Sequence, residues 1–300
     1  MRSCSLEMNM EKNNQMSDFY IITNQSKDPN FEVTHRIRDY LVGCGKTCRI
    51  QEQGPKKVGK GYTDSNLVNE NVDCVLVLGG DGTMLQAAAD LADLIVPFLG
   101  INLGTLGFLA EVNKDDIEGA LSKLIAGEFE IEKRMMLAGY VYDLSGSEPK
   151  DVTRALNDIV ITRKGSLQII TFTISVNGQF LHRYSADGII VATPTGSTGY
   201  NLSAGGPVVD PKAEIMVISP ICPHSMQHNS IILSPEDEVT ITIEEGHDGA
   251  RQEVEAIFDG SHRVTLRTGD RIVMKRSEKT TGIVKLNKVS FLESLHNKMA

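Results

Sequence analysis

The segment best suited to phosphate chemistry is a glycine-rich turn, Gly79-Gly-Asp-Gly-Thr83. It follows the apolar run Asp73–Leu78, which has the composition of a buried strand, and it precedes a helical pattern that ends at Asp93. Glycines let the backbone approach a ligand closely, and amides at a helix start attract anions. A carboxylate there, Asp81, repels phosphate unless it holds a metal or takes a proton. A tight strand–helix turn with a capping aspartate is the plainer alternative. We expect phosphate contacts from Gly79, Gly80, Gly82 and Thr83.

A second cluster, rich in hydroxyls and glycines, runs from Thr193 to Pro207 (TPTGSTGYNLSAGGP). It follows the apolar run Gly188–Ala192, so it also lies at the end of an expected strand. Hydroxyls and exposed amides suit ribose, phosphate and the edges of a base, and Tyr200 can pack on a ring. Asp187 lies six residues before the cluster, close enough in sequence to reach the same ligand. A hydroxyl-rich loop without a ligand is the alternative.

A third candidate is the polar pair Asn157-Asp158 within the apolar stretch Ala155–Ile161. Adjacent residues of a strand face opposite sides, so at least one of the pair would face a core. Burial of an unpartnered polar group is costly, which favours a ligand or a turn at this point. A bulge with internal hydrogen bonds would also account for the pair. The later Asp259-Gly260-Ser261 is interpreted as a turn at a strand end.

Two other patterns are weaker. Gly54-Pro-Lys-Lys-Val-Gly-Lys60 matches the start of a P-loop, but Gly61 stands where serine or threonine would ligate magnesium. We expect a basic surface loop there. His224 and His228 have the spacing of metal ligands on a helix, but nearby prolines disfavour a helix. They are interpreted as loop histidines.

The pattern of expected secondary structure around these residues changes once along the chain. From Asp18 to about Glu130, strand-like runs alternate with helical patterns, which predicts a parallel α/β sheet. After Ile131, short β-rich runs with turn signals such as Asn177-Gly178 predict an all-β domain. The expected organisation is a flexible tail (1–17), an α/β nucleotide-binding domain (18–131, completed by 275–300) and a β-rich domain (132–274).

Composition limits the classes of function. The 300 residues include 30 basic and 39 acidic side chains, and the net charge of −9 argues against a basic face for nucleic acid or membranes. No run approaches the roughly 20 apolar residues of a membrane span, and the polar N-terminus lacks the apolar core of a signal peptide. Five cysteines without paired ligand spacing favour reduced thiols over a zinc site. We expect a soluble cytoplasmic protein.

Taken together, the motifs resemble the NAD kinase family. The glycine-aspartate turn alone is shared with lipid kinases and phosphofructokinases, whereas the Thr193–Pro207 stretch is more specific. The resemblance implies a Rossmann-like α/β N-terminal domain, an all-β C-terminal domain and an active site between them. It also implies transfer of the γ-phosphate of ATP to the 2′-hydroxyl of the adenosine ribose of NAD, which gives NADP. The matching pieces occur in the family's order and spacing: Gly79–Thr83, Asn102–Leu109, Asn157-Asp158, Asp187-Gly188 and Thr193–Pro207.

Carried over position by position, the resemblance gives Asp81 the role of proton acceptor. Asp158, Gly199 and Ser261 stand where other members carry Glu, Ala and Gln, and the change at Ser261 puts one contact in question. The residues expected to bind NAD are Gly82, Phe108, Asn157, Asp158, Gln168, Asp187, Thr195, Thr198, Gly199, Tyr200, Asn201, Leu202 and Ser203.

The resemblance further implies ATP or inorganic polyphosphate as donor, with a divalent metal such as Mg²⁺. It also implies a homo-oligomer, either a tetramer or a dimer. Two alternatives remain open from the residues alone. One is a lipid or other kinase that shares the glycine-aspartate turn, although the acidic chain shows no basic amphipathic anchor for a membrane. The other is a sensor that binds NAD(P) without phosphate transfer.

Overall fold

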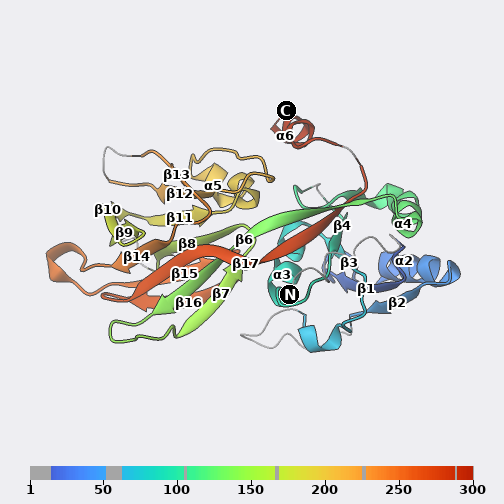
Figure 1. Cartoon of the computed structure of the whole chain (residues 1–300), viewed down its shortest axis with the longest axis horizontal. Coiled ribbons are helices and arrows are strands. Elements are labelled where there is room, and N and C mark those ends of the chain that lie inside the picture. Colours follow the sequence, from blue (N-terminus) through green and yellow to red (C-terminus); the bar gives the residue numbers. More distant parts are fainter. Residues whose placement is uncertain are drawn as a thin grey trace, which may run out of the picture. The chain divides into compact units, whose positions relative to one another are not determined.

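The computed structural model describes residues 15–51, 63–104, 107–165, 169–224, 228–287 and 289–299. The chain divides into two compact units (Figure 1). The first contains the chain up to Glu132 and from Gly282 onward, and the second contains Lys133–Thr281. The first is an α/β unit with a parallel sheet and the second is antiparallel β, so the predicted fold class is confirmed. The P-loop-like stretch Gly54–Gly61 lies outside the described residues.

The first unit is built on a parallel sheet. Its strands run in the order β4-β3-β1-β2, and β5 and the end of β17 also pair with β4. Corresponding residues of β1 and β3 pair directly, with Ile21 opposite Leu76. The elements of this unit are β1 (Asp18–Thr23), α2 (Glu32–Gly43), β2 (Thr47–Ile50), η1 (Ser65–Leu67), β3 (Cys74–Gly79), α3 (Asp81–Asp90), β4 (Phe98–Asn102), β5 (Val112–Asn113), η2 (Lys114–Asp116), α4 (Ile117–Ala126) and α6 (Phe291–Met299).

Continuous apolar runs produce this sheet, because parallel strands are covered on both faces. All six residues of β3 are buried, as are all five of β4. Helix α4 contributes Ile117, Leu121 and Leu124 at helical spacing to the same core. Met16 is also buried in it, and Ser17 donates to Asp73, so the chain is anchored before the expected end of the tail at residue 17.

The starts of helices α2 and α3 are fixed by nearby residues. Helix α2 begins at Glu32, directly after Phe31, whose left-handed conformation interrupts the backbone. The Asp28 carboxylate accepts the backbone amide of Thr34 at 2.9 Å, so it caps the helix from upstream. Helix α3 begins at Asp81, which places the aspartate in its first turn.

The second unit consists of two antiparallel sheets. One has the order β10-β9-β14-β17, with β6 on β17 and β7 on β6, and the other has the order β13-β12-β11-β8-β15-β16. The strands are β6 (Glu130–Tyr142), β7 (Asp151–Ala155), β8 (Asp158–Arg163), β9 (Ile170–Val176), β10 (Gln179–Ala186), β11 (Gly188–Ala192), β12 (Met216–Ile221), β13 (Ile231–Leu233), β14 (Val239–Ile243), β15 (Glu253–Phe258), β16 (His262–Arg267) and β17 (Arg271–Lys285).

Side chains from both sheets form one core in this unit. Phe172 and Ile241 from the first sheet pack with Ile161 and Phe258 from the second, as expected for a sandwich. The short segments η3 (Thr195–Thr198), α5 (Tyr200–Ser203) and η4 (His247–Gly249) lie between strands.

Asn177-Gly178 connects β9 and β10 with positive φ at both residues, which confirms the predicted hairpin.

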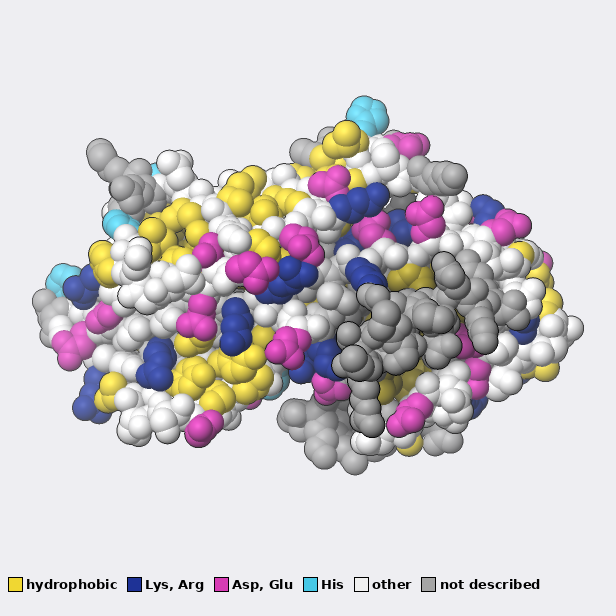
Figure 2. Space-filling model, in the orientation of Figure 1, with side chains coloured by type: hydrophobic (Ala, Val, Ile, Leu, Met, Phe, Trp, Pro, Cys, Tyr) yellow, Lys and Arg dark blue, Asp and Glu magenta, His cyan; other side chains and the backbone are white. Residues whose placement is uncertain are grey.

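On the face drawn in Figure 2, basic and acidic side chains of the described residues are interspersed. Among the helices that the structure describes, none is long and apolar enough to span a membrane. Among the described residues, Cys44, Cys48, Cys74 and Cys222 are free thiols, and the reduced state of the cysteines stays a prediction.

Candidate active site

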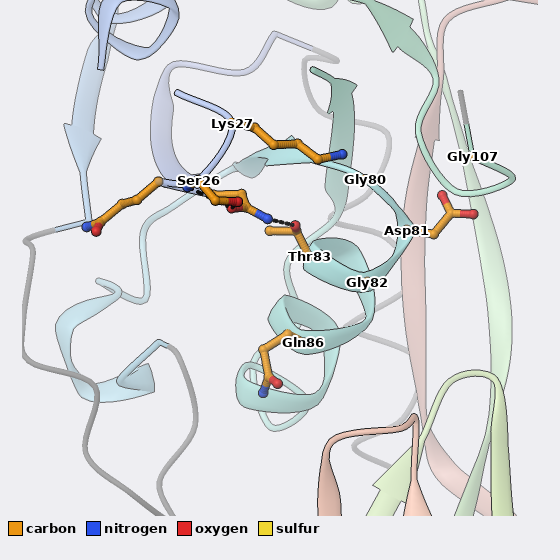
Figure 3. Close-up of a pocket in the computed structure, with 10 residues that line it drawn as sticks. Ser26, Lys27, Gly80, Asp81, Gly82, Thr83, Gln86 and Gly107 are labelled. Atoms are coloured by element: carbon orange, nitrogen blue, oxygen red, sulfur yellow. Dashed lines mark hydrogen bonds between the residues drawn. The ribbon is translucent and has the colours of Figure 1, made fainter. Parts of the chain in front are cut away.

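A pocket of about 840 Å³ lies in the first unit where β1 and β3 end (Figure 3). In a parallel sheet the loops at the carboxyl ends of the strands form the ligand crevice. The predicted phosphate-binding residues Gly80, Gly82 and Thr83 line it, together with Asp81. The full lining is Asn24, Gln25, Ser26, Lys27, Gly80, Asp81, Gly82, Thr83, Gln86 and Gly107.

Asp81 is fixed by the backbone of the following loop. Its carboxylate accepts the amide of Phe108 at 2.6 Å and the amide of Leu109 at 3.0 Å. A β-carbon at Gly107 would overlap this carboxylate, so any larger residue there would displace the Asp81 side chain. Figure 3 shows the Asp81 side chain directed toward the Gly107 segment, away from Thr83. The predicted catalytic aspartate therefore has a single, firmly held orientation.

Gly79 and Thr83 form a compact strand–helix junction. A β-carbon at Gly79 would overlap the Thr83 side chain, so the glycine makes room for the threonine. The Thr83 hydroxyl accepts a hydrogen bond from the Asn24 side-chain amide at 3.1 Å. The backbone amide of Asn24 donates to the Leu78 carbonyl at 2.8 Å. The loop after β1 is thereby attached to the glycine-rich turn after β3.

Lys27 is a pocket residue that the sequence analysis did not identify. Its exposed side chain reaches over the glycine turn, with the ammonium nitrogen 3.2 Å from where a β-carbon of Gly80 would stand. The same nitrogen is 3.1 Å from the corresponding position at Gly104. The Asn102 side chain exchanges hydrogen bonds with the backbone of Gly104 and so holds that loop. The sequence signal that could have identified Lys27 is its position just after a strand of the parallel sheet, where ligands bind.

Phe108, predicted to line the NAD pocket, is half-buried and carries a cation on its ring. The ammonium of Lys298, from α6, lies 3.6 Å from the ring centroid, in the range of a cation–π contact. Burial lowers the pKa of Lys298, and the charge of Asp81 opposes this shift. The ammonium nitrogen is buried and hydrogen-bonds to no residue that the structure describes. Lys298 was also missed, because 190 residues separate it from Phe108.

In the second unit, the hydroxyl-rich loop forms η3 and α5 and is held largely by its own side chains. The Ser197 hydroxyl donates to the Pro194 carbonyl at 2.6 Å and accepts the amide of Val209 at 3.0 Å. Arg134 donates to the hydroxyl of buried Thr195 at 3.3 Å. Thr198 and Gly199 are half-buried, and the exposed residues of the loop are Tyr200, Leu202 and Ser203.

Asn201 has a structural position within this loop. It is fully buried, its amide group donates to the carbonyls of Ser197 and Pro207, and its oxygen accepts from Ser219. A β-carbon at Gly206 would overlap the Asn201 side chain, so this glycine also makes room for a neighbour. The side chain is committed to shaping the loop, and the substrate contact expected of it stays a prediction.

The structure brings Asn157, Asp158 and Gly199 together. From the position of a β-carbon at Gly199, the Asn157 amide nitrogen is 3.3 Å away and an Asp158 carboxylate oxygen is 3.8 Å away. Asn157 lies immediately before β8, so the polar pair is at the strand end rather than inside the strand. The side-chain oxygen of Asn157 is buried without a hydrogen-bond partner among the described residues. A buried, unpaired acceptor beside a glycine loop is suited to a ligand that donates a hydrogen bond.

Two buried carboxyl groups lie at this point. Burial, and then the charge of Asp259, raise the pKa of Asp158 to about 7. Burial also raises the pKa of Asp259, to about 6, although backbone amides of Leu156, Asn157 and Asp158 donate to its carboxylate and oppose the rise. Asp158 is therefore the carboxyl that holds a proton near neutral pH.

Because the pKa of Asp158 is raised, the free energy of unfolding should depend on pH. An unfolded aspartate titrates near pH ~3.9, so between about pH 4 and 7 the folded chain retains a proton that the unfolded chain has lost. The contribution of this protonated carboxyl to the stability of the folded chain is fully present below this pH range and is lost as the pH rises through it. Relative to Asp158→Asn, the wild-type free energy of unfolding should fall by about 2 kcal/mol between pH ~5 and ~7, as measured by urea denaturation. Parallel pH curves for the two proteins would contradict it.

Of the remaining predicted site residues, Asp187 is paired and Gln168 is not described. Arg163 donates to the Asp187 carboxylate at 2.8 Å, and both side chains are partly exposed. Gln168 lies outside the described residues. Residues 225–227, between His224 and His228, lie outside the described residues, so the interpretation of the pair as loop histidines stays a prediction.

No dedicated metal centre is present among the described residues, since no group of three or more His, Cys, Asp or Glu side chains could hold an ion. Magnesium in phosphoryl-transfer enzymes is typically held by one or two carboxylates together with substrate phosphates. A single carboxylate beside a glycine-rich turn at a helix start, as at Asp81, fits a metal that arrives with a nucleotide.

Comparison with known proteins covers both units. Residues 19–129 match the family model of the ATP-NAD kinase N-terminal domain, and residues 156–286 match that of the ATP-NAD kinase C-terminal domain. The chain belongs to the ATP-NAD kinase family. Family membership favours NAD kinase activity over the lipid kinase and the non-catalytic sensor that the residues alone left open.

Similar proteins agree with the family assignment. The NAD kinases of Lachnospira eligens and Lachnoclostridium phytofermentans are both 44% identical to this chain, over 95% and 94% of it and 100% and 99% of their own length. A crystal structure of yeast NADH kinase complexed with NADH has a TM-score of 0.82 at 25% identity, covering 96% of this chain and 88% of that one. An NAD kinase from Archaeoglobus fulgidus in complex with ATP has a TM-score of 0.73 at 26% identity, covering 90% of this chain and 94% of that one.

Proposed function

We propose that the chain transfers the γ-phosphate of ATP to the 2′-hydroxyl of the adenosine ribose of NAD, with Asp81 as proton acceptor. The observation that carries this proposal is the Asp81 carboxylate, held by the amides of Phe108 and Leu109 in a pocket lined by Gly80, Gly82 and Thr83. The family assignment supports the reaction.

Asp81 orients the attacking oxygen and takes its proton late. A carboxylate is too weak a base to ionise a ribose hydroxyl beforehand, and phosphoryl transfer passes through a loose transition state in which positioning dominates. Two amide donors restrict the carboxylate to one orientation, so its free lone pairs point in fixed directions. The proton leaves the 2′-oxygen as the bond to phosphorus forms.

The donor phosphates bind at the amides of Gly80 and Gly82 and at the side chain of Thr83, where the start of α3 favours anions. The Lys27 ammonium, lying over Gly80 and Gly104, contributes the positive charge of this pocket. Asp81 would also hold Mg²⁺ brought by the nucleotide, and the ion would offset repulsion between the carboxylate and the phosphates.

The adenosine half of NAD binds to the second unit. The unpaired oxygen of Asn157 accepts a hydrogen bond from an amino group of the substrate, such as that of adenine. Asp158, with its proton, can donate to a ribose or base acceptor. The backbone and exposed side chains of the hydroxyl-rich loop complete this site: Thr195, Thr198, Gly199, Tyr200, Leu202 and Ser203.

The activity is tested by incubating the purified chain with NAD, ATP and magnesium and measuring NADP with an NADP-specific dehydrogenase. We expect NADP to form with wild type. Calorimetric NAD binding without any NADP would contradict the kinase and favour a sensor. Parallel reactions with polyphosphate and with NADH define the range of donors and acceptors.

Replacement of Lys27 separates donor binding from NAD binding. Because a charged hydrogen bond to phosphate contributes about 1.5–3 kcal/mol, Lys27→Ala should raise KM for ATP by about 10–100-fold. KM for NAD should stay within about threefold. The matched control is Lys46→Ala, a half-buried lysine of the same unit that does not line this pocket. Equal ATP kinetics for the two variants would exclude Lys27 from the donor site.

We further propose that the enzyme acts in the cytoplasm as a homo-oligomer, either a tetramer or a dimer. Exposed apolar side chains support self-association, among them Phe180 on β10 and Ile232 on β13, which are 68% and 56% exposed. Light scattering of the purified protein gives the oligomer number, and a monomer at micromolar concentration would contradict the proposal.

A further inference from the structure

We propose that Asp259 is a positioning residue for NAD, which acts by holding the backbone segment Leu156–Asp158 so that Asn157 meets the substrate. The inference rests on the proposed NAD site in the second unit. It assigns a role to a residue that the sequence analysis interpreted only as part of a turn.

The Asp259 carboxylate accepts three consecutive backbone amides. One oxygen accepts from Asn157 at 2.7 Å and from Asp158 at 3.2 Å, and the other accepts from Leu156 at 2.7 Å. Hydrogen bonds from amides to an ionised carboxylate are stronger than neutral ones. All three are formed between residues more than 100 positions apart in sequence. The segment is thus anchored by a distant side chain rather than by its own strand.

The backbone conformation at Asp259 places its carboxylate next to the amides of Leu156–Asp158. Its φ of 46° and the φ of 69° at Gly260 form a tight left-handed turn after β15. The amide of Asp259 donates to the Asp158 carbonyl at 3.1 Å, which extends the pairing of β15 with β8 by one step. Aspartate tolerates the left-handed region better than most residues with a β-carbon.

The carbonyl side of the segment is held by a second residue. Thr193 donates its hydroxyl to the Leu156 carbonyl at 2.6 Å and its amide to the Asn157 carbonyl at 2.8 Å. Asp259 and Thr193 therefore satisfy both the donors and the acceptors of the segment. The buried side-chain oxygen of Asn157 is left unpaired. A fully restrained backbone presents this acceptor in one place, which lowers the entropic cost of binding a donor group.

The test compares two buried turn carboxylates of the same unit. Asp270 accepts the amides of Arg267 at 2.9 Å and Leu144 at 3.1 Å, so Asp270→Asn weakens the same kind of interaction away from the NAD segment. Both Asp259→Asn and Asp270→Asn should lower the melting temperature. Only Asp259→Asn should raise KM and Kd for NAD, by about 10–100-fold, with kcat and KM for ATP within about threefold of wild type.

A double-mutant cycle shows whether Asp259 acts through Asn157. Asn157→Ala removes the unpaired acceptor, so adding Asp259→Asn to it should weaken NAD binding much less than Asp259→Asn does in wild type. Hydrogen exchange supplies a readout independent of activity, since the amides of Leu156, Asn157 and Asp158 should lose protection in Asp259→Asn alone. Additive effects on NAD affinity would overturn the proposal.

Other results would reject the positioning role of Asp259 or the NAD site on which it rests. Unchanged NAD affinity in Asp259→Asn, or an equal loss in Asp270→Asn, would overturn the positioning role. If Asp259→Asn does not fold, Asp259→Glu is measured in the same way, and failure of both to fold while Asp270→Asn folds would make Asp259 purely structural. Failure of wild type to bind NAD at all would instead reject the NAD site, and the exchange experiment would still report on the anchoring of the segment.

Discussion

Asp81→Asn is expected to lower kcat by about 10²–10⁴-fold, the range for loss of a general base, while NAD affinity changes by less than about threefold. The carboxylate accepts both loop amides, and the asparagine can accept only one while presenting an NH₂ group to the other. The variant therefore loses the proton acceptor, while one of the two loop amides keeps its partner and holds Phe108 and Leu109 close to their native positions.

The measurement is steady-state NADP formation, combined with calorimetry of NAD binding and a thermal melt. Asp115→Asn is a suitable control because it removes an exposed carboxylate of the same unit outside the pocket. We expect native kinetics from this control. Turnover of Asp81→Asn within tenfold of wild type would exclude the proton-acceptor role, whereas a large loss of NAD affinity would indicate that Asp81 mainly organises the loop.

Gly196→Ala is expected to disrupt the second unit at the backbone segment Leu156–Asp158. A β-carbon at Gly196 would overlap the backbone carbonyl of Asn157, and a backbone group cannot rotate away as a side-chain end can. Either η3 or the segment must shift, which costs about 1–3 kcal/mol of stability. The shift would also displace the Asn157 acceptor, so NAD affinity should fall by about 100-fold or more.

Thermal unfolding and NAD calorimetry measure both effects. Gly43→Ala is the matched control, since a β-carbon there meets no atom within 4 Å at the end of α2. This control should retain wild-type affinity and lose no stability, because alanine is the better helix former. A Gly196→Ala protein with native melting temperature and NAD affinity would show that the contact relaxes at no cost.

The candidate site could be located from sequence where the signal is local. The glycine-aspartate turn follows a continuous apolar strand, and the hydroxyl-rich loop follows another, so a short stretch of sequence contains both the strand and the loop at its end. Asn177-Gly178 specified its hairpin because few residues accept two successive positive φ angles. The two-part fold followed from the change in pattern near Ile131.

The unpredicted residues depend on contacts that no local pattern contains. Asp259 reads as an ordinary turn residue, and only the pairing of β15 with β8 carries its side chain to Leu156–Asp158. Lys27 has the appearance of a surface lysine until β1 and β3 are placed side by side. Asn201 was expected to contact NAD from the family resemblance, and its side-chain hydrogen bonds to neighbours in the folded loop could not be predicted from local sequence.

The first unit is assembled from both ends of the chain, and this has a consequence for biosynthesis. Its parallel sheet is extended by the end of β17, where Ile283 pairs with Phe98, and Val284 is buried in the same core. On the ribosome these residues emerge only after the whole second unit has been made. The β-rich unit is thus an insertion that can fold during translation, whereas the α/β unit is completed last. A ribosome that stops before residue 282 leaves the α/β unit without the strand end that pairs with β4, and an unpaired sheet edge is prone to aggregation.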